Sequence, residues 1–261
     1  FWSGAYGAIA CPSGHQFYEA RWLRNPRYVR DYARYWFRTP GAQPHRYSAW
    51  MADSAWATHL VHPNEEFLAD LLPDLRRNLE SWTSRSWVKE TGMFWQVGHD
   101  DGMEFNIASR QTKNILSGAP SYRPSFNSYM WADLRALARI SHLLGDPDAA
   151  TIYEKKAAAL KDSMQRKLWD PRRQFFLAMF RDDEEDGEGN RVRKNTRMYE
   201  TGKFAGSPHG REDRYDAGPL GRVVHGHDTG PGHRRLGRRS GSGSSFQHHR
   251  QRPGREHGFA H

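Results

Sequence analysis

The sequence has a single cysteine, Cys11, among its 261 residues. One thiol excludes an intrachain disulfide and a metal cluster held by several thiolates, and it favours neither an oxidising nor a reducing compartment. Long apolar runs are also missing. The mean hydropathy is −0.92, and no stretch approaches the roughly 18–20 apolar residues that a membrane-spanning helix needs. We therefore predict a soluble protein without a membrane partner, either cytoplasmic or secreted.

Aromatic residues, by contrast, make up 13% of the chain and include ten Trp. Flat rings either add volume to a core or offer surfaces against which sugars or bases stack. Composition by itself favours the core, and a ligand-binding use needs evidence from motifs.

The segment Thr201–His261 differs in composition from the rest of the chain. It has none of the Trp residues, eight of the fourteen His and thirteen of the twenty-four Gly, and its eleven basic and five acidic residues carry +6 of the net charge of +9. Such a segment buries too little apolar surface to offset the entropy lost on ordering. We expect a domain over residues 1–212 and a low-complexity, disordered tail over residues 213–261.

Two origins fit the tail. A frameshifted reading of a GC-rich coding sequence produces such a composition, and so does a basic extension that binds polyanions. Its basic residues are not interleaved with the aromatic residues typical of sequence-specific recognition, so we predict no specific nucleic-acid partner.

Upstream of the tail, apolar residues recur at helical spacing. Pro26–Arg38 is predicted as a helix capped by Asn25, with Tyr28, Tyr32, Tyr35 and Trp36 on one face. Further helices are expected over Tyr47–His59, from Pro63 to Trp82, over Phe126–Leu144, and from the Asp146–Pro147 cap through Ile152 to Leu168. A hairpin is expected between 174–180 and 191–198, and we interpret its acidic run, 182–188, as a solvated turn. Paired helices of this kind favour an all-α toroid.

The stretch Trp95–Asn106 is the first candidate site. It holds three carboxylates and one histidine, namely His99, Asp100, Asp101 and Glu104. Glycoside hydrolysis needs a proton donor beside an apolar wall and a second carboxylate that activates water. Glu104, flanked by Met103 and Phe105, fits the donor. The alternative is that these acids only cap turns.

Five motifs resemble, in their order and spacing, the mannosylglycerate-hydrolase-like and family 63 glycoside hydrolases, relatives of trehalase. They are Phe1–Gly4, Gly14–Leu23, Tyr47–Asp53, Asp100–Glu104 and Arg123–Asp133. The resemblance covers roughly residues 1–212. It implies a partial (α/α)₆ toroid, hydrolysis with inversion, and neither a metal in the chemical step nor a cofactor.

By the same resemblance, the general acid corresponds to Glu104, which is one methylene longer than the Asp of those relatives. In the alternative, Glu104 holds sugar hydroxyls and Asp101 or Asp100 is the donor. Asp133 corresponds to a pocket-lining acceptor, or else to an acid buried against Arg123 or Arg135. The family's general base lies far beyond the acid, past His261. We therefore expect no base in this chain and no activity from the chain alone.

Side chains around these acids offer the donors and rings that a carbohydrate substrate requires. The substrate-binding candidates are Trp95, Asp100, Arg110, Gln111, Arg123, Asn127, Trp131 and Asp133. Arg110 and Arg123 also suit a carboxylated sugar, or form surface ion pairs. His15 is expected to be a core residue. Two other functional classes stay open, a non-catalytic carbohydrate-binding helical domain and a helical scaffold with a polyanion-binding tail.

Overall fold

The computed structural model describes residues 10–103, 109, 111–114, 116–186 and 189–198. The predicted tail, Glu104 and Arg110 lie outside these residues. No helix in the described part of the chain is long and apolar enough to cross a membrane.

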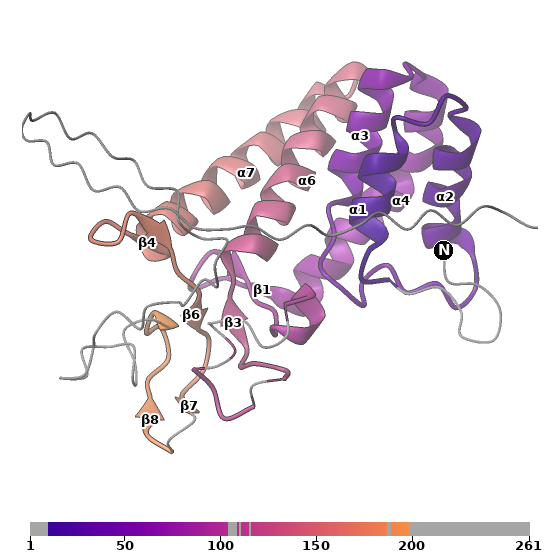
Figure 1. Cartoon of the computed structure of the whole chain (residues 1–261). Helices are drawn as coiled ribbons and strands as arrows, with labels where there is room; N and C mark the ends of the chain where they lie inside the picture. Colours follow the sequence, from indigo (N-terminus) through magenta and orange to yellow (C-terminus); the bar gives the residue numbers. More distant parts are fainter. Residues whose placement is uncertain (1–9, 104–108, 110, 115, 187–188, 199–261) are drawn as a thin grey trace, which may run out of the picture. The chain divides into compact units, whose positions relative to one another are not determined.

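Helices account for most of the described structure (Figure 1). They are α1 (Ser13–Ala20), α2 (Arg27–Arg38), α3 (Met51–Val61), α4 (Glu65–Ser86), α6 (Pro124–Leu143) and α7 (Pro147–Lys167). A single 3₁₀ turn among these residues, η1, covers His99–Asp101. The strands are two residues long and pair in antiparallel fashion: β1 (Trp87–Val88) with β2 (Met93–Phe94), β3 (Ser121–Tyr122) with β6 (Met179–Phe180), β4 (Trp169–Asp170) with β5 (Phe175–Phe176), and β7 (Glu184–Glu185) with β8 (Arg191–Val192).

Local signals explain most helix ends. The Asn25 side chain accepts a hydrogen bond from the Arg27 amide at 3.0 Å, and Asp146 accepts one from the Ala149 amide at 3.1 Å, as N-capping side chains do. Gly145 has φ of +77° directly after α6, a left-handed conformation that ends helices. The predicted boundaries of α2, α6 and α7 are confirmed within a few residues.

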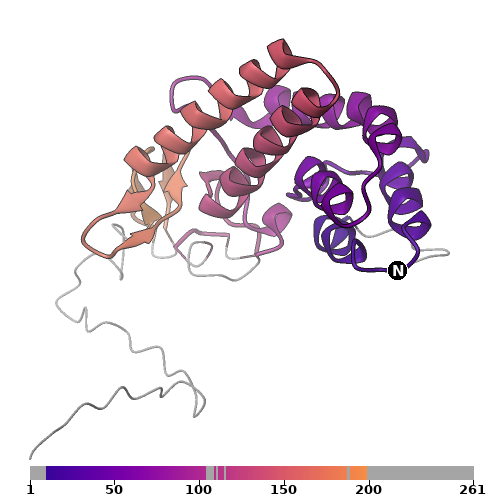
Figure 2. The same ribbon diagram turned by 90° about the horizontal axis from the view of Figure 1, so that it is seen from above.

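The helices alternate between an inner and an outer layer, as Figure 2 shows from above. Inner helices α1, α3 and α6 contact one another in sequence, and α6 packs against the outer helices α4 and α7. Ser54 of α3 lies against Gly14 at the start of α1, and His62, just after α3, lies 3.0 Å from the backbone oxygen of Leu23, shortly after α1. Trp50 lies against Tyr129 near the start of α6. Further along, Arg139 of α6 lies over Trp56 of α3. The inner helices are therefore parallel, which is the arrangement of a partial helical toroid.

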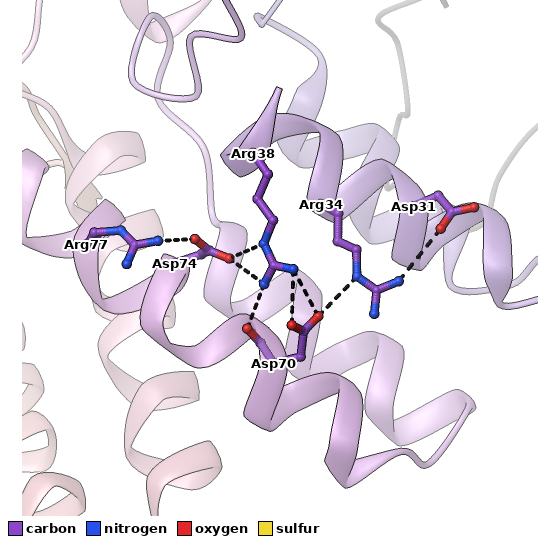
Figure 3. Close-up of polar contacts among 6 residues, drawn as sticks. All are labelled: Asp31, Arg34, Arg38, Asp70, Asp74 and Arg77. Atoms are coloured by element: carbon purple, nitrogen blue, oxygen red, sulfur yellow. Dashed lines mark hydrogen bonds and ion pairs between the residues drawn. The ribbon is translucent and has the colours of Figure 1, made fainter. Parts of the chain in front are cut away.

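The outer helices α2 and α4 are joined by a ladder of ion pairs (Figure 3). Arg34 pairs with Asp70 at 3.1 Å, and Arg38 pairs with Asp74 at 2.8 Å and with Asp70 at 3.1 Å. Arg77 of α4 closes the ladder on the buried Asp74. Because both the arginines and the aspartates are four residues apart, one helical turn of each element faces one turn of the other, and α2 and α4 are parallel.

Two apolar residues named in the predicted helical pattern are exposed. Tyr28 is 66% exposed and Ile152 is 52% exposed. The buried stripe of α2 consists of Val29, Tyr32, Ala33 and Trp36, and at 100° per residue Tyr28 falls beside it. Ile152 is two residues from the buried Ala150, a rotation of about 200° that turns it to the outside of α7.

Two predictions for the first hundred residues also need correction. The short helix α1, which contributes Phe17 to the core, was not predicted. The helix expected from Tyr47 begins at Met51 instead. The reason for this start lies outside the local sequence, in a carboxyl group of α6 described below.

The predicted hairpin is confirmed only in part. Residues 178–180 and 195–198 are joined by backbone hydrogen bonds, among them Met198 N–H to Ala178 O at 2.9 Å, but the strand partner of β6 is β3. The acidic run is not one solvated turn, because Glu184–Glu185 forms β7. Asp186 is buried and accepts hydrogen bonds from the Asn190 backbone and side chain at 2.8 and 3.0 Å.

Candidate functional site

The acidic turn η1 is held closed by its own backbone. The Asp101 amide donates to Val97 O and Gly98 O, both at 3.2 Å, and the Met103 amide returns to Gly98 O at 2.9 Å. Gly102 has φ of +66°, and a Cβ at this position would lie 3.2 Å from Cys11 Sγ. Glycine therefore suits both the left-handed conformation and the close approach of Cys11.

This turn contacts the segments that precede all three inner helices. Cys11 comes just before α1. The Ser48 amide, just before α3, donates to Asp100 O at 2.9 Å. Arg123, the residue before α6, donates from Nε to Asp101 Oδ2 at 2.8 Å. The parallel N-termini of α1, α3 and α6 thus face one acidic turn, and their backbone dipoles favour negative charge there.

Asp101 is the most tightly bound carboxylate of the turn. Its side chain is 0% exposed and pairs with the guanidinium of Arg123, which is 4% exposed. Ser125, in the first turn of α6, donates a second hydrogen bond to the same oxygen. A side chain with no exposed surface does not reach a glycosidic oxygen in this conformation. The geometry therefore fits a residue that positions the turn, and not the alternative proton donor expected from the sequence.

Asp100 and His99 are half-buried and lie together. His99 Nδ1 is 2.9 Å from Asp100 Oδ1, and the His99 ring lies 5.7 Å from the ring of Tyr47. Each side chain is about one third exposed. Asp100 is thus the carboxylate of the described turn that remains open to a ligand.

An aromatic wall stands beside the turn. Trp50 packs on Tyr129 with ring centroids 4.4 Å apart, and His15 meets Trp50 edge-on at 4.6 Å. Burial raises the pKa of the Tyr129 hydroxyl, and the negative charge of Asp101 adds to the rise. His15 is exposed, so the expectation of a core histidine was wrong.

Asp133 is buried, and its hydrogen bonds come from backbone amides of α3 and not from Arg123 or Arg135, the two expected partners. Its Oδ1 accepts a hydrogen bond from the Asp53 amide at 3.0 Å, and the amides of Met51 and Ala52 also point to it. These are the first three residues of α3. Asp133 therefore caps α3 from a neighbouring helix, which explains why α3 begins at Met51, and its 1% exposure leaves no surface for a substrate.

Burial raises the pKa of the Asp133 carboxyl well above its usual value, with the nearby Asp53 carboxyl adding to the rise and the three amides opposing it. The folded protein then holds a proton that the unfolded chain has lost above about pH 4. Stability should fall as pH rises from that value through the folded pKa.

We expect Asp133→Asn to flatten this fall, since the amide oxygen still accepts from α3 and does not titrate. Urea unfolding between pH 4 and 8, followed by Trp fluorescence, measures the difference. The exposed Asp148→Asn serves as control. A wild-type minus variant difference that stays constant with pH would contradict the prediction.

Two further substrate-binding candidates are buried. Asn127 is 0% exposed. Its side chain accepts from the Phe94 amide at 2.8 Å and donates to Phe94 O at 2.8 Å and to Arg123 O at 2.9 Å. It fixes β2 to the start of α6, and in this conformation it has no exposed surface for a substrate. Gln111 is also buried, and Arg123 forms a buried ion pair with Asp101.

The two predicted Trp platforms lie apart. The Trp95 ring is covered by the guanidinium of Arg181, 3.9 Å from the ring centre. Trp131 lies in a pocket between α6 and α7, together with Phe176. Of the predicted residues, the structure brings together Asp100, Asp101 and Arg123, whereas Glu104 and Arg110 lie outside the described residues.

Sequence reasoning missed Trp50 and Ser125 as neighbours of the turn. Ser125, Tyr129 and Asp133 are spaced by four residues and lie on the face of α6 that meets the turn and α3. This i, i+4 pattern was a usable signal. Within the described residues, no group of three or more His, Cys, Asp or Glu could hold a metal ion.

One family model and two solved structures match this chain. The model of the mannosylglycerate hydrolase MGH1-like glycoside hydrolase domain matches residues 5–199. A solved structure named "Sialidase" is 33% identical, with a TM-score of 0.62, over 70% of this chain and 17% of that chain. A second, the GH78 family rhamnosidase of Bacillus sp. GL1, is 15% identical, with a TM-score of 0.38, over 59% of this chain and 15% of that chain. The present chain thus spans less than a fifth of either structure's length.

Proposed function

Because the chain belongs to the mannosylglycerate hydrolase MGH1-like glycoside hydrolase family, we propose that it carries the proton-donating side of a glycosidase active site, with Glu104 as the general acid. The observation that supports this most directly is the anchoring of the turn just before Glu104. Asp100, Asp101 and Gly102 touch the segments before α3, α6 and α1, respectively. The backbone from which Glu104 follows is therefore fixed at the N-terminal end of the inner helices.

The chemistry divides between two carboxyl groups. A protonated acid gives its proton to the leaving oxygen, and a carboxylate on the opposite face of the sugar activates water. We assign the first role to Glu104. Asp101 and Asp133 are both buried and engaged, with Arg123 and with the start of α3, so neither suits the second role. We propose that the base lies outside residues 10–198 and that the 261-residue chain alone is inactive.

The substrate is proposed to be a carbohydrate that enters beside Asp100 and the Trp50–Tyr129 wall. A partly exposed carboxylate accepts hydrogen bonds from sugar hydroxyls, and a partly exposed indole offers a flat apolar surface to a pyranose ring. Two arginines, Arg110 and Arg123, were considered for binding a carboxylated sugar. Arg123 already forms a buried ion pair with Asp101. Such a substrate therefore depends on Arg110, which makes mannosylglycerate a more demanding test than a neutral mannoside.

A chimera tests whether hydrolysis proceeds with inversion. In it, residues 5–199 of this chain replace the matched segment of the protein whose solved structure is named "Sialidase" and is 33% identical. The panel comprises mannosylglycerate, an aryl sialoside and neutral aryl mannosides, glucosides and rhamnosides. We expect hydrolysis of at least one of them by the folded chimera and none by the 261-residue chain. Proton NMR during the first turnovers should show the anomer of inverted configuration. A first product of retained configuration, from a carboxyl pair about 5 Å apart, would exclude the proposed mechanism.

A further inference from the structure

A pocket of about 220 Å³ lies on a face of α6 other than the one that bears Ser125 and Tyr129. Its lining comes from α6 and α7, which lie side by side in Figure 1, and from β5. The lining residues are Pro124, Ser128, Trp131, Lys161, Met164, Gln165 and Phe176. We call it the α6–α7 pocket.

The α6–α7 pocket is separate from the acidic turn. On α6, Pro124, Ser128 and Trp131 follow the i, i+4, i+7 spacing of one helix face, and these line the pocket. Ser125 binds Asp101 and Tyr129 packs on Trp50, which places them on a different face of the same helix. A ligand in the pocket therefore meets other side chains than a ligand at the turn.

Two aromatic rings in the pocket are held in place. Trp131 and Phe176 are partly buried and pack against the hydrophobic core. The Phe176 ring also meets Trp169 at 5.0 Å, through the β4–β5 pairing. The Arg135 guanidinium also lies over the Trp131 ring, 5.4 Å from the ring centre. Rings that are already fixed lose little side-chain entropy when a ligand contacts them.

The polar side chains around these rings are unengaged. Ser128, Lys161 and Gln165 are exposed, and they make no side-chain hydrogen bond to any residue that the structure describes. Together they offer a hydroxyl, an ammonium and an amide beside two apolar surfaces. Lys161 is the one charged residue of the lining, so neither a polyanion nor a cation is favoured.

We propose that the α6–α7 pocket binds one neutral pyranose unit, as a second saccharide site distinct from the acidic turn. The C–H face of the sugar covers Trp131 or Phe176, and its hydroxyls bind Ser128, Lys161 and Gln165. Sugars combine one apolar face with a polar rim, which matches this lining. That the ligand is a sugar, and not another amphipathic molecule, rests on the proposed function. The geometry of the pocket is independent of that function.

The test uses the full 261-residue chain with methyl α-D-mannopyranoside, methyl α-D-glucopyranoside and methyl α-L-rhamnopyranoside, followed by saturation-transfer NMR and titration calorimetry. We expect binding of at least one glycoside, and a loss of roughly tenfold in affinity for Trp131→Ala. Trp22→Ala is the matched control, because Trp22 is 64% exposed and lies outside the pocket; its affinity should equal that of the wild type.

Loss of a partly buried ring can also disturb packing, so Gln165→Leu and Lys161→Met are measured as well. Both residues are exposed, and each substitution keeps most of the apolar stem of the side chain while removing its hydrogen-bonding end. Affinity should fall several-fold with unchanged thermal stability. The proposal is overturned if no glycoside binds, if Trp22→Ala weakens binding as much as Trp131→Ala, or if Trp131→Ala abolishes self-association of the chain without changing sugar binding.

The outcomes separate this site from the proposed catalytic one. Glu104→Gln in the chimera should leave pocket binding intact. Sugar binding that depends on Trp131, in a chimera that hydrolyses nothing, would support the second site and refute the catalytic proposal; that result would favour a carbohydrate-binding domain. Hydrolysis by the chimera without sugar binding at Trp131 would support the catalytic proposal and refute the second site.

Discussion

Glu104→Gln is expected to lower kcat of the chimera by on the order of 10²–10⁴-fold, the usual contribution of a general acid. The loss should depend on the leaving group. Glutamine donates no proton to the glycosidic oxygen, so an alkyl glycoside with a poor leaving group should lose the full factor. A dinitrophenyl glycoside, whose phenolate departs without protonation, should lose far less. Hydrolysis rates over a series of aryl and alkyl glycosides measure this dependence.

The pH profile gives a second readout for the same substitution. A general acid must be protonated to act, so kcat/KM of the unsubstituted chimera should fall on the alkaline side as Glu104 ionises. In Glu104→Gln this alkaline limb should vanish. Glu66→Gln, an exposed glutamate of α4, is the matched control and should change neither the rate nor the profile.

Asp101→Asn discriminates between the two candidate acids. An asparagine oxygen still accepts from Arg123 and Ser125 but does not balance the buried charge of Arg123, so the variant should be less stable than the unsubstituted chimera. In the chimera that remains folded, the turn should stay anchored and most of the activity should remain. If Asp101→Asn instead removes the alkaline limb and Glu104→Gln does not, Asp101 is the donor and the burial of its side chain is relieved when substrate binds.

Some helix ends are set by neighbouring residues and others by residues far away in the sequence. The ends of α2, α6 and α7 were predictable because Asn25, Gly145 and Asp146 act on residues within three positions of themselves. The start of α3 was not, because its cap is Asp133, eighty residues away. The spacing of apolar residues identifies the buried face of a helix, but it does not identify the element that packs against that face.

The same limit applies to the candidate site. The sequence indicated that Asp100, Asp101 and Arg123 belong to one site, and the structure brings them together. It also suggested Asn127 and Trp131 as substrate-binding neighbours of these acids, because an amide and an indole suit a sugar. A rotation of 100° per residue sends Asn127 to Phe94 and Trp131 to the α6–α7 pocket. Only the packing of α3 against α6 decides which face meets the turn.

Arg123→Met is expected to destabilise the folded chain by about 3–5 kcal/mol, the usual effect of leaving a buried charge without its partner. The Asp101 side chain has no exposed surface, and Arg123 supplies its ion pair. Ser125 remains as a neutral donor but does not balance the charge. Urea unfolding followed by Trp fluorescence measures the loss. Arg166→Met provides the control, because the Arg166–Asp162 pair is more than half exposed on both sides and such pairs contribute at most about 1 kcal/mol.

A double variant distinguishes the ion pair from simple loss of packing. Replacing both partners, as Arg123→Met with Asp101→Leu, removes the buried charge together with its counter-ion, and apolar replacements of buried pairs are often close to neutral. The double variant should therefore be more stable than Arg123→Met alone, although its turn is no longer anchored to α6. In the chimera it should fold and yet lose activity, because Glu104 follows directly from that turn. If the double variant is both stable and fully active, the pair neither balances charge nor positions the acid.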